Sequence, residues 1–192
     1  MAVPVVRRLL VSVSAGAFLL AGAAGVRAAP QRNLEYEVKG AFLYNFLTFI
    51  DWPEAAFPHP SSPFRLCLLG RDPFGPAIDQ LVQGESVGTH RIVVDRLKEV
   101  RAVASCHAVF ISDLEDERLD GIVRITEKQS VLLVGETPRL NQLCGGIVFA
   151  LEGERVRFDI NLPALTSRGL KVSAKLLRVA REASDRSGRC PR

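Results

Sequence analysis

The 192-residue sequence lacks the residue patterns that most metal and cofactor sites require. No two of its four cysteines have CxxC spacing, and its three histidines (His59, His90 and His107) are scattered, so a zinc site is not expected. It contains no GxGxxG or Walker sequence, and no motif supplies a converging Ser-His-Asp triad. We therefore expect a protein that is not an enzyme, with no catalytic residues, no cofactor and no metal.

A large excess of charge of one sign is also lacking. The chain has 25 basic and 21 acidic residues, a net charge of +4. Three of the basic residues, Arg7, Arg8 and Arg27, lie within the first 28 residues, which hold no acidic residue, so the rest of the chain has a net charge of only +1. This balance gives no reason to expect binding to nucleic acid.

Long hydrophobic runs are absent except at the N-terminus. There, Arg7 and Arg8 precede the uncharged stretch Leu9–Ala24, and Val26-Arg27-Ala28 follows with small or modest residues at the cleavage positions, which is typical of a secretory signal. We expect cleavage after Ala28 and export of the remainder. A retained membrane anchor is the alternative, although Ala, Gly and Ser dilute the stretch and its length is marginal for a hydrocarbon core of roughly 30 Å.

The remaining residues are enough for one hydrophobic core, so we expect a single domain over residues 29–183 and a polar tail over residues 184–192. Apolar periodicity predicts helices that alternate with short, very apolar strands. The expected helices cover residues 34–50, 72–84, 97–104 and 115–125, with further short helices through 165 and from 173. The expected strands cover residues 64–69, 91–95, 107–112 and 131–134. Such alternation is typical of a mostly parallel sheet flanked by helices.

The pattern changes near the C-terminus. Two apolar runs, residues 146–151 and 155–160, are separated by Glu152-Gly153-Glu154, and the second run alternates apolar with polar residues. This predicts an antiparallel β-hairpin at one edge of the sheet. The predicted fold class is therefore α/β, with one domain and a mixed, mostly parallel sheet.

Three segments of the chain carry a recognisable pattern. The first is residues 39–53, KGAFLYNFLTFIDWP. The second combines residues 66–75, LCLLGRDPFG, with residues 106–112, CHAVFIS. The third combines residues 146–149 (GIVF), 158–162 (FDINL) and 169–177 (GLKVSAKLL). Together they resemble the YfiR family of periplasmic regulators, and the resemblance extends from about residue 34 to residue 181.

The resemblance implies a small periplasmic α/β protein without known catalysis. It implies a regulator that represses a membrane-bound diguanylate cyclase by binding its periplasmic part, with output in cyclic di-GMP and biofilm formation, and that an outer-membrane lipoprotein can sequester. A homodimer is a further expectation. The alternative is a periplasmic small-ligand-binding subunit that feeds a sensor kinase; its ligand would sit at the carboxyl ends of the strands near Arg71 and Ser112.

The resemblance also implies a disulfide between Cys67 and Cys106, which match the family's bridge in type and spacing. Adjacent parallel strands would bring the two close enough, and the alternative is two buried free thiols. Cys144 and Cys190 are less determined. Cys190 in the tail would replace a partner cysteine that this sequence lacks near Leu151, whereas free or intermolecular cysteines are the alternative.

The last helices contain more apolar residues than one amphipathic face needs. We expect some of them to be exposed and to contact another protein or a second copy of the chain. The alternative is that all of them close the core. The candidate partner-binding residues are Leu162, Leu165, Leu170, Val172 and Leu176.

Overall fold

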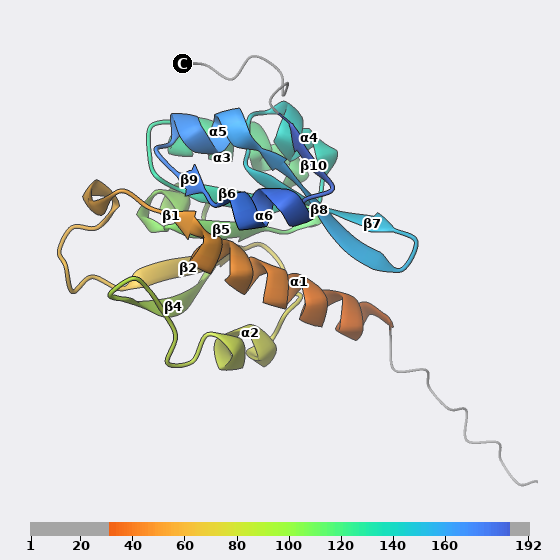
Figure 1. Ribbon diagram of the computed structural model, residues 1–192, viewed down its shortest axis with the longest axis horizontal. Coiled ribbons are helices and arrows are strands. Elements are labelled where there is room, and N and C mark those ends of the chain that lie inside the picture. The colour runs from red at the N-terminus through yellow and green to blue at the C-terminus, as the bar shows by residue number, and fades with distance from the viewer. Residues whose placement is uncertain (1–30, 185–192) are drawn as a thin grey trace, which may run out of the picture.

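The computed structural model describes residues 31–184, and the predicted signal peptide therefore lies outside the described residues. The chain folds as one α/β domain around an eight-stranded sheet with the strand order β10-β8-β7-β6-β5-β2-β4-β3, and helices cover both of its faces (Figure 1). A separate two-stranded ladder pairs β1 with β9. No helix among residues 31–184 is both long enough and apolar enough to cross a membrane.

The central strands of the main sheet are short and almost wholly buried, as parallel strands covered on both faces must be, whereas the outer strands are partly exposed. Their bounds are β2 (Phe64–Leu69), β3 (Ser86–Val87), β4 (His90–Leu97), β5 (Ala108–Ile111), β6 (Leu132–Gly135), β7 (Ile147–Glu152), β8 (Arg155–Asn161) and β10 (Glu182–Ser184). The two-stranded ladder consists of β1 (Ile50–Asp51) and β9 (Lys171–Val172). The central pairs from β4 to β7 are parallel, and β7 and β8 form an antiparallel hairpin.

The helices connect these strands. The α-helices are α1 (Gln31–Phe49), α2 (Pro76–Leu81), α3 (Leu119–Thr126), α4 (Pro138–Gln142), α5 (Leu162–Ser167) and α6 (Ala174–Val179). Three 3-10 helices are η1 (Glu54–Ala56), η2 (Val100–Ser105) and η3 (Asp113–Arg118). The long helix α1 lies across one face of the sheet, and in Figure 1 its orange ribbon runs in front of the other elements.

Successive side chains of a strand point to opposite faces, so this sheet has two hydrophobic cores. In β2, Leu66 and Leu68 face the core under α1, whereas Cys67 and Leu69 face the second core. The first core contains the buried part of α1, α2 and α6 together with Phe149 and Phe158 of the hairpin; the second contains η2, α3 and α4. Helices on both faces explain why the strands read as continuous apolar runs.

The sequence-based fold class is confirmed, as are the four predicted parallel strands and the hairpin. Two details differ. The hairpin is followed by β10, which pairs in parallel outside β8 and includes Ser184, the first residue of the predicted tail; residues 185–192 lie outside the described residues. The predicted helix over residues 97–104 is shorter and of 3-10 type, because β4 extends to Leu97.

Candidate functional site

An apolar groove of about 410 Å³ lies between α1, β8 and α6. Its apolar lining is Phe42 and Phe49 of α1, Phe158 of β8, and Leu176 and Val179 of α6. Phe42 and Phe49 are seven residues apart and therefore lie on the same side of α1. The Phe42 ring meets the Phe158 ring edge to face at a centroid distance of 5.2 Å, so the floor is a continuous aromatic surface.

The polar lining of the groove is neutral or positively charged. Asn45, Arg157 and Lys175 complete it, and no carboxylate lines it. Arg157 forms an ion pair with Glu152 at 3.5 Å, whereas Lys175 forms no hydrogen bond or ion pair with any residue in the described part of the chain. An apolar floor with an unpaired ammonium group at its rim favours an apolar ligand that carries negative charge.

The groove continues into exposed apolar surface. Val179 at its edge is 55% exposed, Leu34 at the start of α1 is 65% exposed, and Leu151 on the hairpin is 52% exposed. Single exposed apolar residues are common, but several around one apolar groove indicate an interaction surface. This groove, with Val179 and Lys175 at its rim, is the best candidate for a partner-binding site among the described residues.

Three of the five predicted partner-binding leucines and valines do not lie at the surface. Leu165, Leu170 and Leu176 are at most 2% exposed and belong to the first core, which corrects the expectation that they are exposed; Leu176 nevertheless lines the groove described above. The reason is the β1–β9 ladder: it pairs Ile50 with Val172 and draws the segment between α5 and α6 onto the end of α1. Leu162 and Val172 are half-buried, and their role at an interface stays a prediction.

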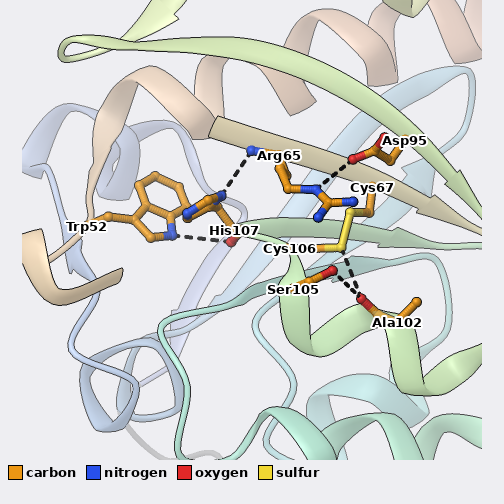
Figure 2. The surroundings of a disulfide bond; sticks show 8 residues. All are labelled: Trp52, Arg65, Cys67, Asp95, Ala102, Ser105, Cys106 and His107. Carbon is orange, nitrogen blue, oxygen red and sulfur yellow. Dashed lines mark hydrogen bonds and ion pairs between the residues drawn. A yellow bond between two sulfur atoms is a disulfide. The ribbon is translucent and has the colours of Figure 1, made fainter. Parts of the chain in front are cut away.

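The predicted bond between Cys67 and Cys106 is confirmed. Cys67 lies on β2 and Cys106 immediately precedes the neighbouring parallel strand β5, so their Cα atoms are 6.1 Å apart (Figure 2). Both residues are buried in the second core. Near them, Arg65 of β2 pairs with Asp95 of β4 at 2.8 Å, which places an ion pair on the same side of the sheet.

A family model described as YfiR/HmsC-like matches residues 36–181, which is most of the chain and nearly all of the described domain. The chain belongs to the YfiR/HmsC-like family. No curated protein matches the sequence. Members of this family are periplasmic regulators rather than enzymes, and the family assignment agrees with the resemblance found in the sequence.

Of the second pair of cysteines in this YfiR/HmsC-like chain, only Cys144 lies within the described residues. Cys144 is disulfide-bonded and has a positive φ of 61°, in the loop between α4 and β7. Cys190, the partner that the sequence offers, lies outside the described residues, so the Cys144–Cys190 bond stays a prediction.

A buried arginine holds the Cys144 loop through hydrogen bonds, and the sequence did not reveal this role. Arg168 ends α5, and its Nη1 donates to the carbonyl oxygens of Gly145 and of Ala164, the latter at 3.1 Å. Burial lowers the pKa of Arg168 to about 10. Only a solvated cation would have been expected there from the sequence, because nothing in the local pattern shows that α5 packs beside this loop.

Arg71 and Ser112, the predicted ligand site, do not line the candidate groove. Arg71 is exposed, whereas Ser112 is buried and its Oγ lies against Gly70, together with the side chain of Glu115. Gly70 has a φ of 87°, and a Cβ there would come within 2.9 Å of the Ser112 Oγ, so the chain is closely packed at this strand end. Ligand binding at this place stays a prediction.

His107 has a structural role in this domain. Its Nδ1 accepts a hydrogen bond from the Arg65 backbone N–H at 2.9 Å, and its Nε2 lies 3.2 Å from the Ala56 carbonyl oxygen, so it is the neutral tautomer with a proton on Nε2. Its own carbonyl accepts from the Trp52 indole N–H (Figure 2). Trp52 thus packs the end of α1 onto the sheet, where its ring also meets Phe64 at 4.8 Å.

Acidification is expected to destabilise the protein through His107. Burial lowers the pKa of its imidazole below the usual value, and the nearby charges of His90 and Arg65 lower it further, while the hydrogen bond to Ala56 acts in the opposite direction. The unfolded chain therefore binds a proton that the folded chain rejects, and stability falls as the pH drops below about 6.5, the usual histidine pKa.

The measurement is urea unfolding of the wild type and of His107→Asn at pH 7.5 and pH 5. Asparagine keeps an acceptor near the Arg65 N–H but does not titrate. The wild type should lose more stability on acidification than the variant does. Equal losses in the two proteins would show that His107 does not contribute to the pH dependence.

Proposed function

We propose that this protein is a periplasmic regulator that binds the periplasmic part of an inner-membrane diguanylate cyclase and represses it, lowering cyclic di-GMP and biofilm formation. The family match over residues 36–181 supports a regulatory, non-enzymatic role. The observation that carries the binding role is the open apolar groove between α1, β8 and α6, whose rim residue Val179 is largely exposed.

The regulator would act through differential affinity. A protein that binds the inactive conformation of the cyclase more tightly than the active one shifts the enzyme towards inactivity, and only by that difference in affinity. An outer-membrane lipoprotein that competes for the regulator would release the enzyme, because the two binding events are thermodynamically linked. The domain itself needs no catalytic group for this role.

The test is a substitution at a single exposed position in the groove. Val179→Asp places a carboxylate at the apolar rim, and it should change the free energy of unfolding by less than about 0.5 kcal/mol because the position is exposed. We expect cyclic di-GMP and surface attachment to rise towards the values of a strain that lacks the gene. Cellular cyclic di-GMP is measured by mass spectrometry, with the periplasmic amount of each variant checked by immunoblot.

The matched control is Ile125→Asp, which introduces the same charge at a partly exposed apolar residue on α3, on the other face of the sheet. It should leave cyclic di-GMP at the wild-type level. Unchanged cyclic di-GMP and attachment in the deletion strain would reject the proposed function. A reproducible thermal shift of the purified protein with a metabolite, together with an unchanged deletion strain, would instead favour a ligand-binding subunit for a sensor kinase.

A further inference from the structure

The groove is the inner end of a longer apolar stripe on α1. With 3.6 residues per turn, Leu34, Val38, Phe42 and Phe49 lie within an arc of about 80° on the helix, together with Asn45. This arc is separate from the side that bears Leu43, Phe46 and Leu47, which are fully buried in the core. The stripe extends over 16 residues, from Leu34 to Phe49, or about 22 Å along the helix axis.

The outer half of the stripe is open to solvent. Leu34 is 65% exposed and Val38 is 36% exposed, whereas Phe42 and Phe49 are partly buried against the first core. In Figure 1 the beginning of α1 projects beyond the body of the sheet, and the β7–β8 hairpin projects towards the same side. A helix end that carried only structural apolar residues would have them turned to the core, so the stripe needs another explanation.

The walls beside the stripe are also apolar. Leu151 lies on the same face of the hairpin as Phe149 and Phe158, which both pack against Phe42 of α1. Val179 on α6 bounds the groove at its inner end. A binding partner that covers this surface must therefore be elongated, apolar on one side, and longer than the groove itself.

The charges decide between a second copy of the chain and a different partner. Lys175 lines the groove and forms no ion pair with any other described residue, whereas Arg157, the other charged lining residue, pairs with Glu152, and Glu35 near the start of the stripe pairs with Lys39. A two-fold symmetric contact brings the same patch of both copies together, and the groove lining of the second copy offers Lys175 no carboxylate. A partner that carries carboxylates instead complements the lysine and gains specificity and association rate.

We propose that this surface binds a single amphipathic helix of a partner protein, about four turns long, with aspartate or glutamate beside its apolar face. A helix suits the site because apolar residues at spacings of three and four form ridges into which a second helix packs lengthwise. The proposal rests on the proposed function, since it names the kind of segment through which the regulated protein is held.

The test uses three synthetic 15-residue helical peptides and the purified, exported form of the full chain. The first peptide has a leucine stripe flanked by glutamates, the second has lysines in place of the glutamates, and the third has the composition of the first in scrambled order. Binding is measured by fluorescence anisotropy. We expect the glutamate helix to bind at least about tenfold more tightly than either other peptide, and to weaken as salt is raised.

Variants of the protein test whether the peptides bind to the stripe. Lys175→Glu should weaken the glutamate helix by about tenfold and should strengthen the lysine helix, because the sign of the rim charge is reversed. Val38→Asp should weaken both helices. Lys128→Glu is the matched control: this exposed lysine follows α3 on the other face of the sheet, and its reversal should change neither affinity. Circular dichroism confirms that each variant is folded.

Three results would overturn the proposal: equal binding of the scrambled peptide, tighter binding of the lysine helix to the wild type, or a dimer in sedimentation that Val38→Asp abolishes. The last result would assign the surface to a second copy of the chain. These outcomes are independent of the regulatory role. Failure of the peptides with derepression by Val179→Asp would reject only the helical occupant, whereas an unchanged deletion strain would reject the regulatory function and not the peptide binding.

Discussion

Replacing Cys67 and Cys106 together by alanine is expected to lower the free energy of unfolding by about 4 kcal/mol. The two residues are 39 positions apart, and their bond removes that loop-closure entropy from the unfolded chain. The bond also joins β2 to the segment just before β5, two adjacent interior strands of the sheet, so its loss affects strands that contribute to both cores. Urea unfolding at pH 7.5 measures the change.

The control for this prediction is reduction. Dithiothreitol should destabilise the wild type by at least a comparable amount, whereas in the double variant it can act only on the disulfide of Cys144. A Cys144→Ala variant in the same series separates the contribution of the second cysteine pair. A double variant that unfolds within 1 kcal/mol of the wild type, both under oxidising conditions, would show that the bond contributes little to stability.

Phe46→Ala is expected to cost about 3 to 5 kcal/mol, the range for removing a fully buried phenylalanine. Phe46 of α1 has no exposed surface, and its ring lies 4.8 Å from that of Phe158 and 5.6 Å from that of Phe149. The substitution opens a cavity between α1 and the hairpin that neither element can close, because both are fixed by the sheet. Thermal and urea unfolding provide the measurement.

The matched control is Leu151→Ala on the same hairpin. Leu151 is mostly exposed, and its truncation should change stability by no more than about 0.5 kcal/mol. If Phe46→Ala were no more destabilising than Leu151→Ala, the centre of the first core would not lie between α1 and the hairpin.

The predicted strands agree with the structure because their signal is local. A run such as residues 107–112 is apolar without interruption, which is typical of a strand buried on both faces, and it corresponds to β5. The strands that the sequence analysis missed are short: β1, β3, β9 and β10 have two or three residues each. Such strands exist because a partner strand lies beside them, and a window of two residues contains no periodicity to detect.

Some of the functional residues could likewise be predicted from the sequence, whereas others could not. The spacing of Cys67 and Cys106 within the resembling segments was enough to predict their bond. The five apolar residues named near the C-terminus exceed what one face requires by composition, but composition does not determine which of them faces outwards. In the structure Val179 on α6 is exposed, whereas Leu165, Leu170 and Leu176 belong to the first core.

The sequence by itself determined the α/β class, the central strands and the family, and it predicted an export signal at the N-terminus. Each of these depends on patterns within short segments of the chain. Only the tertiary structure decided where the binding surface lies. The groove joins α1 to β8 and α6, which lie more than a hundred residues further along the chain, and the packing of Phe158 under Phe42 turns separate apolar residues into one floor. In the sequence Lys175 looks like an ordinary surface lysine; the fold places it at the rim of that floor, where it forms no ion pair with any other described residue.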